Sequence, residues 1–432
     1  MRLANCRAGN LRKTGALGWV LGLLLALFLA RPNDAQFEAL AQGSDLFSIG
    51  SPINSKSLDA YAKVIRLDED QLAAARELLK GYRGGLVAML QDLKKKGEAF
   101  EDAQGQDKDP EKMMEHVGTL FKEAADRNRK LEGGFFDDLK SLLMPEQAQK
   151  WATVERARRR EVWQKFGLMY GEGVDLSGTL VRTKVDVHAI AGLGELIESY
   201  ETELDRIMQG RERLVKDYGS KMSGKKMKGG PMAFMAPDFM KPTQDAFKSW
   251  IQDGKKLREL NKSYQRRILD VLPEASRGTF DQEAKRRAYP PVYRDSDTQR
   301  IFTEALRAKN LEPSKTEEIR ALQDLYKKKA APINEKWAKA LEDRQDSAGE
   351  EMMVFMMQMG RGQGDPKSEA VKEAKQTREQ LDDKYTAKVQ ALLGEDEWKA
   401  IKERSAEKEH HWGPDDAPFA FDAEDIEIFE LL

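Results

Sequence analysis

One pattern of apolar and aromatic residues recurs three times along this 432-residue chain and constrains its fold more than any other feature. From each of the starting residues Leu67, Val185 and Leu311, a leucine follows 11 residues later and a tyrosine follows 15 residues later. The leucine and the tyrosine are four residues apart and therefore share one face of a helix. These residues are Leu78, Leu196 and Leu322, and Tyr82, Tyr200 and Tyr326. The pattern predicts a long amphipathic helix at each start.

A second pattern closes each of these three segments. An aromatic residue is followed four residues later by an apolar residue, then by two adjacent apolar residues, and then by a helix-breaking residue. The aromatic residues are Phe135, Tyr264 and Tyr385, the apolar residues are Leu139, Ile268 and Val389, and the breaks are Pro145, Pro273 and Gly394. We therefore expect a second long helix, a break, and a short helix after it.

These patterns predict an all-α protein of three repeated helical-hairpin units with long amphipathic helices. The starts of the pattern lie 118 and then 126 residues apart, and stretches rich in glycine, proline and, in two cases, methionine separate the long helices. We place the units at residues 58–175, 180–295 and 296–408. The composition agrees, because 34% charged and 8% aromatic residues suit thin cores between amphipathic helices.

Both ends of the chain differ from the units. Four basic residues (Arg2, Arg7, Arg12 and Lys13) precede an apolar run at 16–30 and then small residues, which predicts a signal peptide at residues 1–41. We therefore expect export to a periplasm or cell envelope, with an uncleaved membrane anchor as the alternative. Residues 409–432 form an acidic tail that we expect either to be disordered and to dock on a partner, or to pack back on the helices.

A capping motif begins two of the expected helices. Asp68 follows Leu67 and can accept the backbone N–H of Gln71, whose side chain can reach back to the amide of Asp68, which forms a capping box. The second copy has Leu143, then Met144, then Pro145 at the first helical position, and then Gln147. Because methionine is a poor cap, only the glutamine half of the box is available there.

This paired L-x-x-x-Q pattern resembles the motif of the Spy/CpxP-like periplasmic proteins, the LTxxQ-motif family, and the first unit matches best. The third unit departs from it, because Lys315 and Glu397 stand where glutamines are expected. The resemblance implies small helical proteins that form a curved, cradle-like dimer and act as ATP-independent chaperones or as modulators of envelope or metal stress. Three fused units would then replace dimerisation.

Two of the connecting stretches are rich in methionine, whose soft and adaptable side chain suits the binding of varied apolar surfaces. The candidate client-binding residues are Met222, Met227, Met232, Phe234, Met235, Phe239 and Met240 in the second unit, and Met352, Met353 and Met356 in the third. Two alternatives stay open. Thioethers also bind Cu(I), and Met352 and Met356 are spaced to form the buried face of a helix.

The sequence contains no recognisable catalytic motif, and we expect neither an enzyme nor a bound cofactor. No nucleophile elbow, phosphate-binding loop or dinucleotide fingerprint occurs. The four histidines lack metal-ligand spacing and are expected at the surface, and the only cysteine, Cys6, precedes the mature protein. Basic and acidic residues nearly balance, at 72 and 74, which gives no reason to expect a nucleic-acid partner. The arginines at 156–160 are expected to form a solvated face.

The sequence thus predicts an exported, non-catalytic protein whose partners are polypeptide clients or envelope proteins. It would contact a membrane only through an uncleaved signal segment. The two alternatives are a structural scaffold of the cell envelope and copper handling through the methionines.

Overall fold

The computed structural model describes residues 52–104, 110–164, 167, 169–222, 237–308, 311–358 and 366–407. Within these ranges every regular element is a helix and there is no β-strand. The prediction of an all-α protein is confirmed. The predicted signal peptide and the acidic tail lie outside the described residues.

The chain divides into two compact units, and each is assembled from several stretches of sequence. The first contains residues 1–154, 214–248 and 348–364. The second contains residues 155–213, 249–347 and 365–432.

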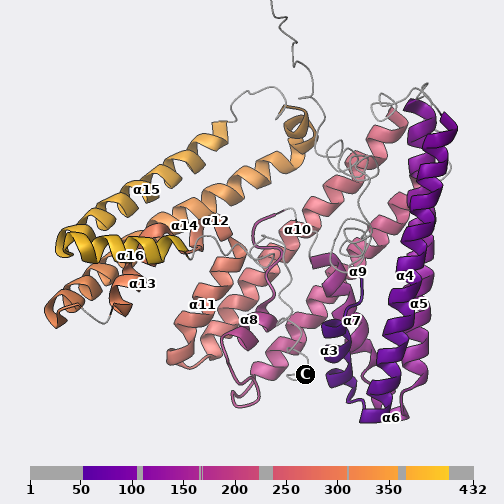
Figure 1. The fold of residues 1–432 in the computed structure, drawn as a ribbon, viewed down its shortest axis with the longest axis horizontal. Coiled ribbons are helices and arrows are strands. Elements are labelled where there is room, and N and C mark those ends of the chain that lie inside the picture. The colour runs from indigo at the N-terminus through magenta and orange to yellow at the C-terminus, as the bar shows by residue number, and fades with distance from the viewer. Residues whose placement is uncertain are drawn as a thin grey trace, which may run out of the picture. The chain divides into compact units, whose positions relative to one another are not determined.

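The first unit is built around a pair of long helices that we call hairpin 1. Helix α3 (Ser55–Ile65) precedes the pair α4 (Glu69–Gln104) and α5 (Pro110–Ser141), and the short α6 (Pro145–Ala148) follows. Figure 1 shows α4 and α5 side by side along their length. Their buried contact includes Tyr82 and Phe135, whose ring centroids are 5.7 Å apart.

The turn that leads into hairpin 1 has a distinctive backbone. The side chain of Asn54 caps α3 by accepting the amide of Ser57 at 2.9 Å. Helix α3 is capped at its C-terminal end by Arg66, a left-handed residue with φ 54°, and the amide of Leu67 bonds back to the carbonyl of Ala62 at 2.9 Å. This is the Schellman arrangement that terminates many helices.

The same turn recurs 118 residues later. Lys184 has φ 56°, and the amide of Val185 bonds to the carbonyl of Leu180 at 3.0 Å. Among the described residues, Arg66 and Lys184 are the two that are not glycine and have a positive φ. This left-handed conformation is uncommon for residues that carry a side chain. The turns that follow the short helices α3 and α8 (Leu176–Arg182) are therefore alike, although α4 begins three residues after Arg66 and α9 (Leu193–Met222) begins nine residues after Lys184.

Hairpin 2 is the helix pair α9 (Leu193–Met222) and α10 (Pro237–Val271). Helices α7 (Trp151–Trp163) and α8 (Leu176–Arg182) precede it, and α11 (Glu274–Ala288) and α12 (Pro290–Tyr293) follow. The rings of Tyr200 on α9 and Tyr264 on α10 pack with centroids 5.3 Å apart.

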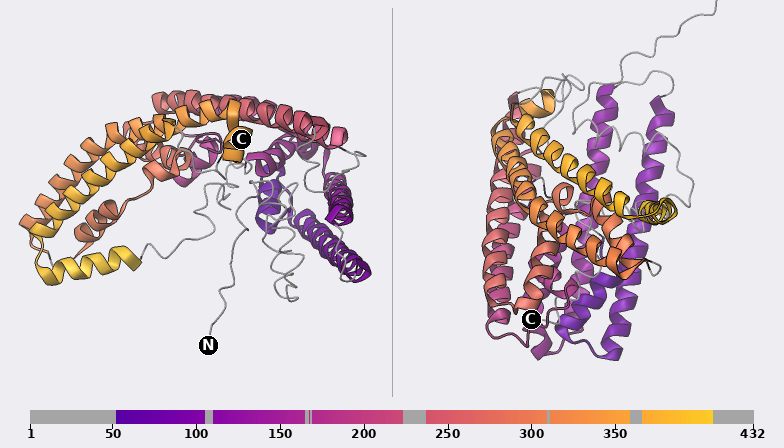
Figure 2. Two further views of the ribbon diagram at one scale, coloured as in Figure 1. Left: turned by 90° about the horizontal axis from the view of Figure 1, so that it is seen from above. Right: turned by 90° about the vertical axis from the view of Figure 1, so that its left-hand side faces the viewer.

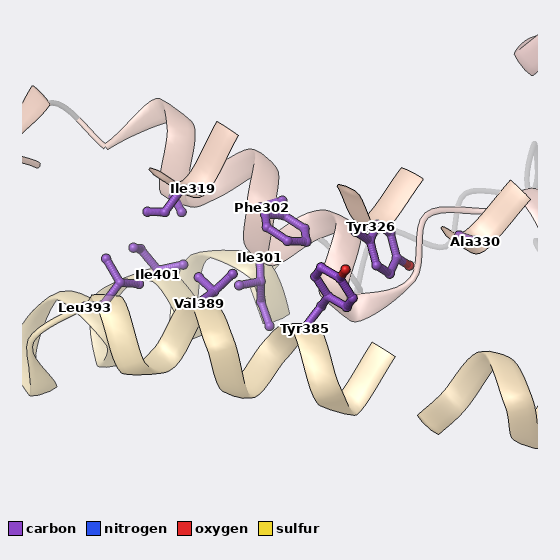
Figure 3. Close-up of a cluster of buried hydrophobic side chains, with 10 residues drawn as sticks. Ile301, Phe302, Ile319, Tyr326, Ala330, Tyr385, Val389, Leu393 and Ile401 are labelled. Atoms are coloured by element: carbon purple, nitrogen blue, oxygen red, sulfur yellow. The ribbon is translucent and has the colours of Figure 1, made fainter. Parts of the chain in front are cut away.

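Hairpin 3 consists of α14 (Pro313–Gln358) and α15 (Pro366–Leu392), with α13 (Asp297–Arg307) before it and α16 (Glu395–Glu407) after it. It belongs to the second unit except for the end of α14, from residue 348 onward, which belongs to the first. Figures 1 and 2 both show α14 and α15 side by side. Figure 3 shows the apolar core between these four helices. There Phe302 of α13 and Tyr326 of α14 face Tyr385 and Val389 of α15.

A short helix precedes each hairpin, and these three helices (α3, α8 and α13) were not anticipated from the sequence. Each has a polar cap at its start. Asn54 and Asp175 accept the amides of Ser57 and Gly178, and Ser296 forms a capping box with Gln299. These short polar signals lie outside the long apolar patterns on which the expectation depended.

No helix among the described residues combines the length and the apolar character needed to cross a bilayer.

Candidate functional site

The capping motif of hairpin 1 brings two glutamines from distant parts of the sequence into direct contact. Nε2 of Gln71 donates to Oε1 of Gln147 at 2.9 Å, and Nε2 of Gln147 donates to Oε1 of Gln71 at 2.8 Å. The two carboxamides thus pair reciprocally, and we call this pair the amide clasp. It ties the start of α4 to the start of α6 at the base of the hairpin.

The amide clasp also satisfies backbone groups that the helix ends leave without partners. Oε1 of Gln71 accepts the amide of Asp68 at 3.1 Å, and Oδ1 of Asp68 accepts the amide of Gln71 at 2.8 Å, which completes the capping box. Oε1 of Gln147 accepts the amide of Met144 at 2.9 Å, whereas the side chain of Met144 makes no cap bond. The first residue of α6 is Pro145, which has no amide to satisfy.

The remaining amide hydrogens of the clasp bond across the hairpin. Nε2 of Gln71 donates to the carbonyl of Leu142 at 2.7 Å, and Nε2 of Gln147 donates to the carbonyl of Arg66 at 2.8 Å. Leu67 and Leu143 lie half-buried beside the clasp. Each glutamine therefore uses both its donor and its acceptor, and the motif fixes the geometry of the helix ends.

Hairpin 3 has a different pair at the corresponding positions. Lys315 is the third residue of α14 and Glu397 the third residue of α16, as Gln71 and Gln147 are in α4 and α6. Nζ of Lys315 donates to Oε2 of Glu397 at 3.1 Å, and the same oxygen accepts the amide of Gly394 at 2.9 Å. That backbone bond and the lysine charge hold the pKa of Glu397 below its ordinary value. We call this pair the ionic clasp.

In the described part of hairpin 2, no clasp of either kind occurs. Asp186 caps the turn before α9 by accepting the amides of His188 and Ala189 at 3.0 and 3.3 Å. At the other helix end, Nε of Arg277 donates to the carbonyl of Leu272 at 2.8 Å. The bases of hairpins 1 and 3 are therefore closed by different cross-hairpin contacts, whereas these polar contacts of hairpin 2 are local to each helix end.

The interiors of the hairpins are more alike than their bases. In hairpin 3 the rings of Tyr326 and Tyr385 are 5.5 Å apart, close to the spacing of the aromatic pairs in hairpins 1 and 2. The hydroxyl of Tyr200 donates to Asn261 at 2.9 Å, and the hydroxyl of Tyr326 donates to Asp382 at 2.5 Å. Each acceptor lies three residues before the second aromatic residue of its pair.

The expectation that the arginines at 156–160 form a solvated face is wrong for Arg158 and Arg160, which are buried. In the second unit, α7 packs on α9 through charged pairs. Arg159 makes a bidentate contact with Asp205 at 2.7 and 3.1 Å, and Arg160 pairs with the buried Glu201. Burial opposes the charge on Arg160, but the carboxylates of Asp175 and Glu201 more than offset this effect and raise its pKa. The arginines are used inside the protein and were missed because charge alone does not reveal burial.

A second buried ion pair lies between α9 and the segment before α8. Arg211 is fully buried, its Nη2 donates to Oε2 of Glu172 at 2.6 Å, and its guanidinium lies over the ring of Trp250 at 4.5 Å. Glu172 also accepts the amide of Met169 at 2.9 Å. A Cβ added at Gly254 would come within 2.4 Å of Oε2 of Glu172. The site is closely packed and leaves no room for a ligand beside the carboxylate.

The methionines proposed to bind clients lie in or next to the segments that connect the long helices. Met227, Met232, Phe234 and Met235 lie outside the described residues, and for the others the backbone alone is described. Met222 is the last residue of α9, and Phe239 and Met240 are in the first turn of α10. Met352, Met353 and Met356 are in the last turns of α14. All of these backbone positions belong to the first compact unit.

The described histidines do not meet to form a metal site. His188 is exposed, whereas His116 stacks on Phe100 with centroids 3.9 Å apart, so the expectation of a surface residue holds for His188 alone. His410 and His411 lie outside the described residues. Within the described residues, no group of three or more histidine, cysteine, aspartate or glutamate side chains could hold a metal ion.

A shallow hollow on α9 is lined by polar and charged side chains, and half of them are carboxylates. Glu195, Glu198 and Glu203 line it together with Arg206, Ser199 and Thr202. The hydroxyl of Tyr264 donates to Glu203 at 2.7 Å and lies 2.7 Å from the hydroxyl of Ser199. These contacts join α10 to α9 at the hollow.

Comparison with known proteins gave no match: no protein-family model, no curated protein and no solved structure is similar to this chain.

Proposed function

We propose that this protein is an exported, non-catalytic protein-binding molecule that acts as an ATP-independent chaperone in a periplasm or cell envelope. The observation that carries the proposal is the position of the methionines. Methionine-bearing ends of α9, α10 and α14 belong to one compact unit, next to the segments that connect the long helices. Flexible thioether side chains in such a place suit apolar segments of varied sequence.

We further propose that the three hairpins are copies of one unit. The paired aromatic residues support this, because they recur at equivalent positions with similar centroid distances. The left-handed residues Arg66 and Lys184 and the short helix before each hairpin also support it. Such a triplicated unit would offer several connecting segments to one client.

The amide clasp is consistent with the resemblance to the Spy/CpxP-like family, on which the chaperone assignment also draws. Gln71 and Gln147 are the glutamines of the two motif copies, and their contact gives the motif a structural reason. The proposed export depends on the signal peptide alone. It is tested by fractionating cells that express the full chain and by sequencing the N-terminus of the mature protein.

The test of the chaperone proposal uses the mature chain from Gln42 with a slowly aggregating unfolded client followed by light scattering. We expect the chain to suppress aggregation. A variant with Met222, Met227, Met232, Met235 and Met240 changed to serine should suppress it less. In the matched control, serine replaces five lysines of the same stretch, Lys221, Lys225, Lys226, Lys228 and Lys241. Equal loss in both variants would remove the methionines from the mechanism, and no suppression by the parent chain would reject the chaperone proposal.

A second candidate function is a structural scaffold of the cell envelope. Among the described residues, the large apolar side chains that stay exposed are Met144, Val271 and Leu325, and they lie on three different segments. This mostly polar surface favours a spacer over a client-binding cradle in the described part of the chain. Small-angle scattering of the mature chain tests the idea, because a compact particle would contradict it.

Copper handling by the methionines is a separate hypothesis. Calorimetric titration with Cu(I) under reducing conditions tests it, and the methionine-to-serine variant above is its control. Binding that is unchanged in that variant would exclude these residues as ligands.

A further inference from the structure

The ionic clasp of hairpin 3 and the amide clasp of hairpin 1 have two hydrogen bonds in common. In both, the third residue of the later short helix accepts the amide of its own cap residue, Met144 or Gly394, at 2.9 Å. In both, the third residue of the first long helix donates to that same acceptor, at 2.9 Å from Gln71 and 3.1 Å from Lys315. The two clasps therefore join equivalent helix ends through different side chains.

Their chemistry differs in a way that the contacts make explicit. A lysine ammonium can only donate and a carboxylate can only accept, so the reciprocal bond from Gln147 to Gln71 has no counterpart in hairpin 3. The bond from Gln147 to the carbonyl of Arg66 is likewise impossible for Glu397. The hydrogen bond that joins the starts of α14 and α16 is thus a charged contact, whose side chains are 30% and 33% exposed.

We infer that the base of hairpin 3 opens in response to salt. At low ionic strength the Lys315–Glu397 pair holds the base closed, and this contact weakens as the salt concentration rises. Contacts between solvent-exposed charges are screened by salt, whereas a pair of neutral carboxamides is not. The amide clasp keeps the base of hairpin 1 closed over the same range. This inference does not depend on the proposed chaperone function.

Apolar side chains lie next to the ionic clasp, and we expect them to become exposed when the clasp opens. Leu393 and Ile401 are buried on either side of Glu397, and Leu311 and Trp398 pack partly buried against the same core. Figure 3 shows Leu393 and Ile401 beside Ile319 of α14. When the clasp opens, the start of α16 loses its tie to the start of α14, and these apolar side chains become accessible first.

The test is hydrogen exchange by mass spectrometry on the full mature chain, at about 0.02 M and about 0.5 M NaCl. We expect peptides covering 311–320 and 393–401 to exchange about two- to five-fold faster at high salt, as the energy of an exposed ion pair allows. Peptides covering 67–76 and 142–151 should keep their exchange rates. An equal response at both bases, or none at hairpin 3, would overturn the inference.

Two matched variants separate the clasp from other charges. Lys315→Gln with Glu397→Gln should convert the ionic clasp into an amide clasp and abolish the salt response. Lys336→Gln with Glu373→Gln removes another exposed pair of the same hairpin, at 2.9 Å, and should leave the response intact. The reciprocal change, Gln71→Lys with Gln147→Glu, should transfer the response to hairpin 1. A salt response that persists in the first variant contradicts the inference.

Discussion

At the scale of single residues, the glutamines of hairpin 1 do more than a cap usually does. Gln147 accepts the amide of Met144, donates to the carbonyl of Arg66, and pairs in both directions with Gln71. We expect Gln147→Ala to destabilise the hairpin base by about 1–2 kcal/mol, because a cap and cross-hairpin hydrogen bonds are lost together. Faster hydrogen exchange in residues 67–76 measures this.

The control for that variant lies two residues away. Gln149 is exposed and follows α6, so Gln149→Ala changes the same chemical group without touching the clasp. Similar exchange in the two variants would show that the clasp contributes nothing at this site.

The buried pair of Arg211 and Glu172 belongs to the same scale and has a larger expected effect. Arg211→Met leaves a buried carboxylate without its cation, and we expect the second unit to lose about 3–5 kcal/mol of stability. Adding Glu172→Gln should recover part of this loss, because the glutamine is neutral and its oxygen can still accept the amide of Met169. Urea denaturation of the single and double variants measures the coupling. Additive losses would argue against a direct pair.

At the scale of elements, hairpin 1 contains glycines in the middle of a long helix. A Cβ added at Gly84 would meet nothing within 4 Å, whereas one at Gly85 would lie 2.6 Å from Cδ2 of Leu131. We expect Gly84→Ala to stabilise α4 by about 0.5–1 kcal/mol, as alanine does in open helix positions. Gly85→Ala should gain less, because Leu131 must move. Thermal unfolding of the two variants compares them, and equal gains would contradict this packing.

The stability of hairpin 3 is expected to depend on alkaline pH through Tyr326. Burial raises the pKa of Tyr326 to about 12, and its hydroxyl donates to Asp382. An unfolded tyrosine ionises near pH 10, so the stabilising contribution is complete below that pH and is lost as the pH rises through about 12. We expect Tyr326→Phe to be less stable at neutral pH but to lose less stability between pH 10 and 12. Circular dichroism across that range measures both. Parallel curves would assign the alkaline loss to other groups.

The long helices were predictable because their evidence is repetitive, whereas the contacts between helices were not. Tyr82, Tyr200 and Tyr326 fall on helix faces that their spacing already indicated, and all three are buried. The burial of Arg160 could not be foreseen, because its partner Glu201 lies 41 residues away on another helix. The contact between Gln71 and Gln147 likewise joins residues 76 positions apart. The motif indicated two capped helices but not that their caps would meet.

At the scale of the whole molecule, the second compact unit joins hairpins 2 and 3 through a polar seam between α10 and α14. Arg258 is buried and contacts both carboxylate oxygens of Asp346 at 2.8 Å, and Lys262 contacts Glu342 at 2.6 Å. Glu342 also accepts the hydroxyl of Tyr289. Charged contacts on two successive turns of α14 therefore fix how hairpin 3 rests on hairpin 2.

Because of this seam, we expect that neutralising Asp346 destabilises the second unit and that neutralising the nearby Asp343 does not. Asp346→Asn leaves the buried Arg258 charge without its main acceptor, and we expect the second unit to lose about 1–3 kcal/mol. Asp343→Asn is the matched control, because Asp343 is exposed and pairs with Lys339 of its own helix at 3.0 Å.

Denaturation gives the total loss of stability in Asp346→Asn, whereas hydrogen exchange shows which helices lose it. In Asp346→Asn, peptides of α14 around 338–347 should exchange faster while those of α15 keep their rates, because hairpin 3 retains its own aromatic core. Equal acceleration throughout hairpin 3 would mean that the seam and the hairpin unfold as one unit. The two hairpins would then be a single cooperative body, and an independent role for each connecting segment in client binding would have to be given up.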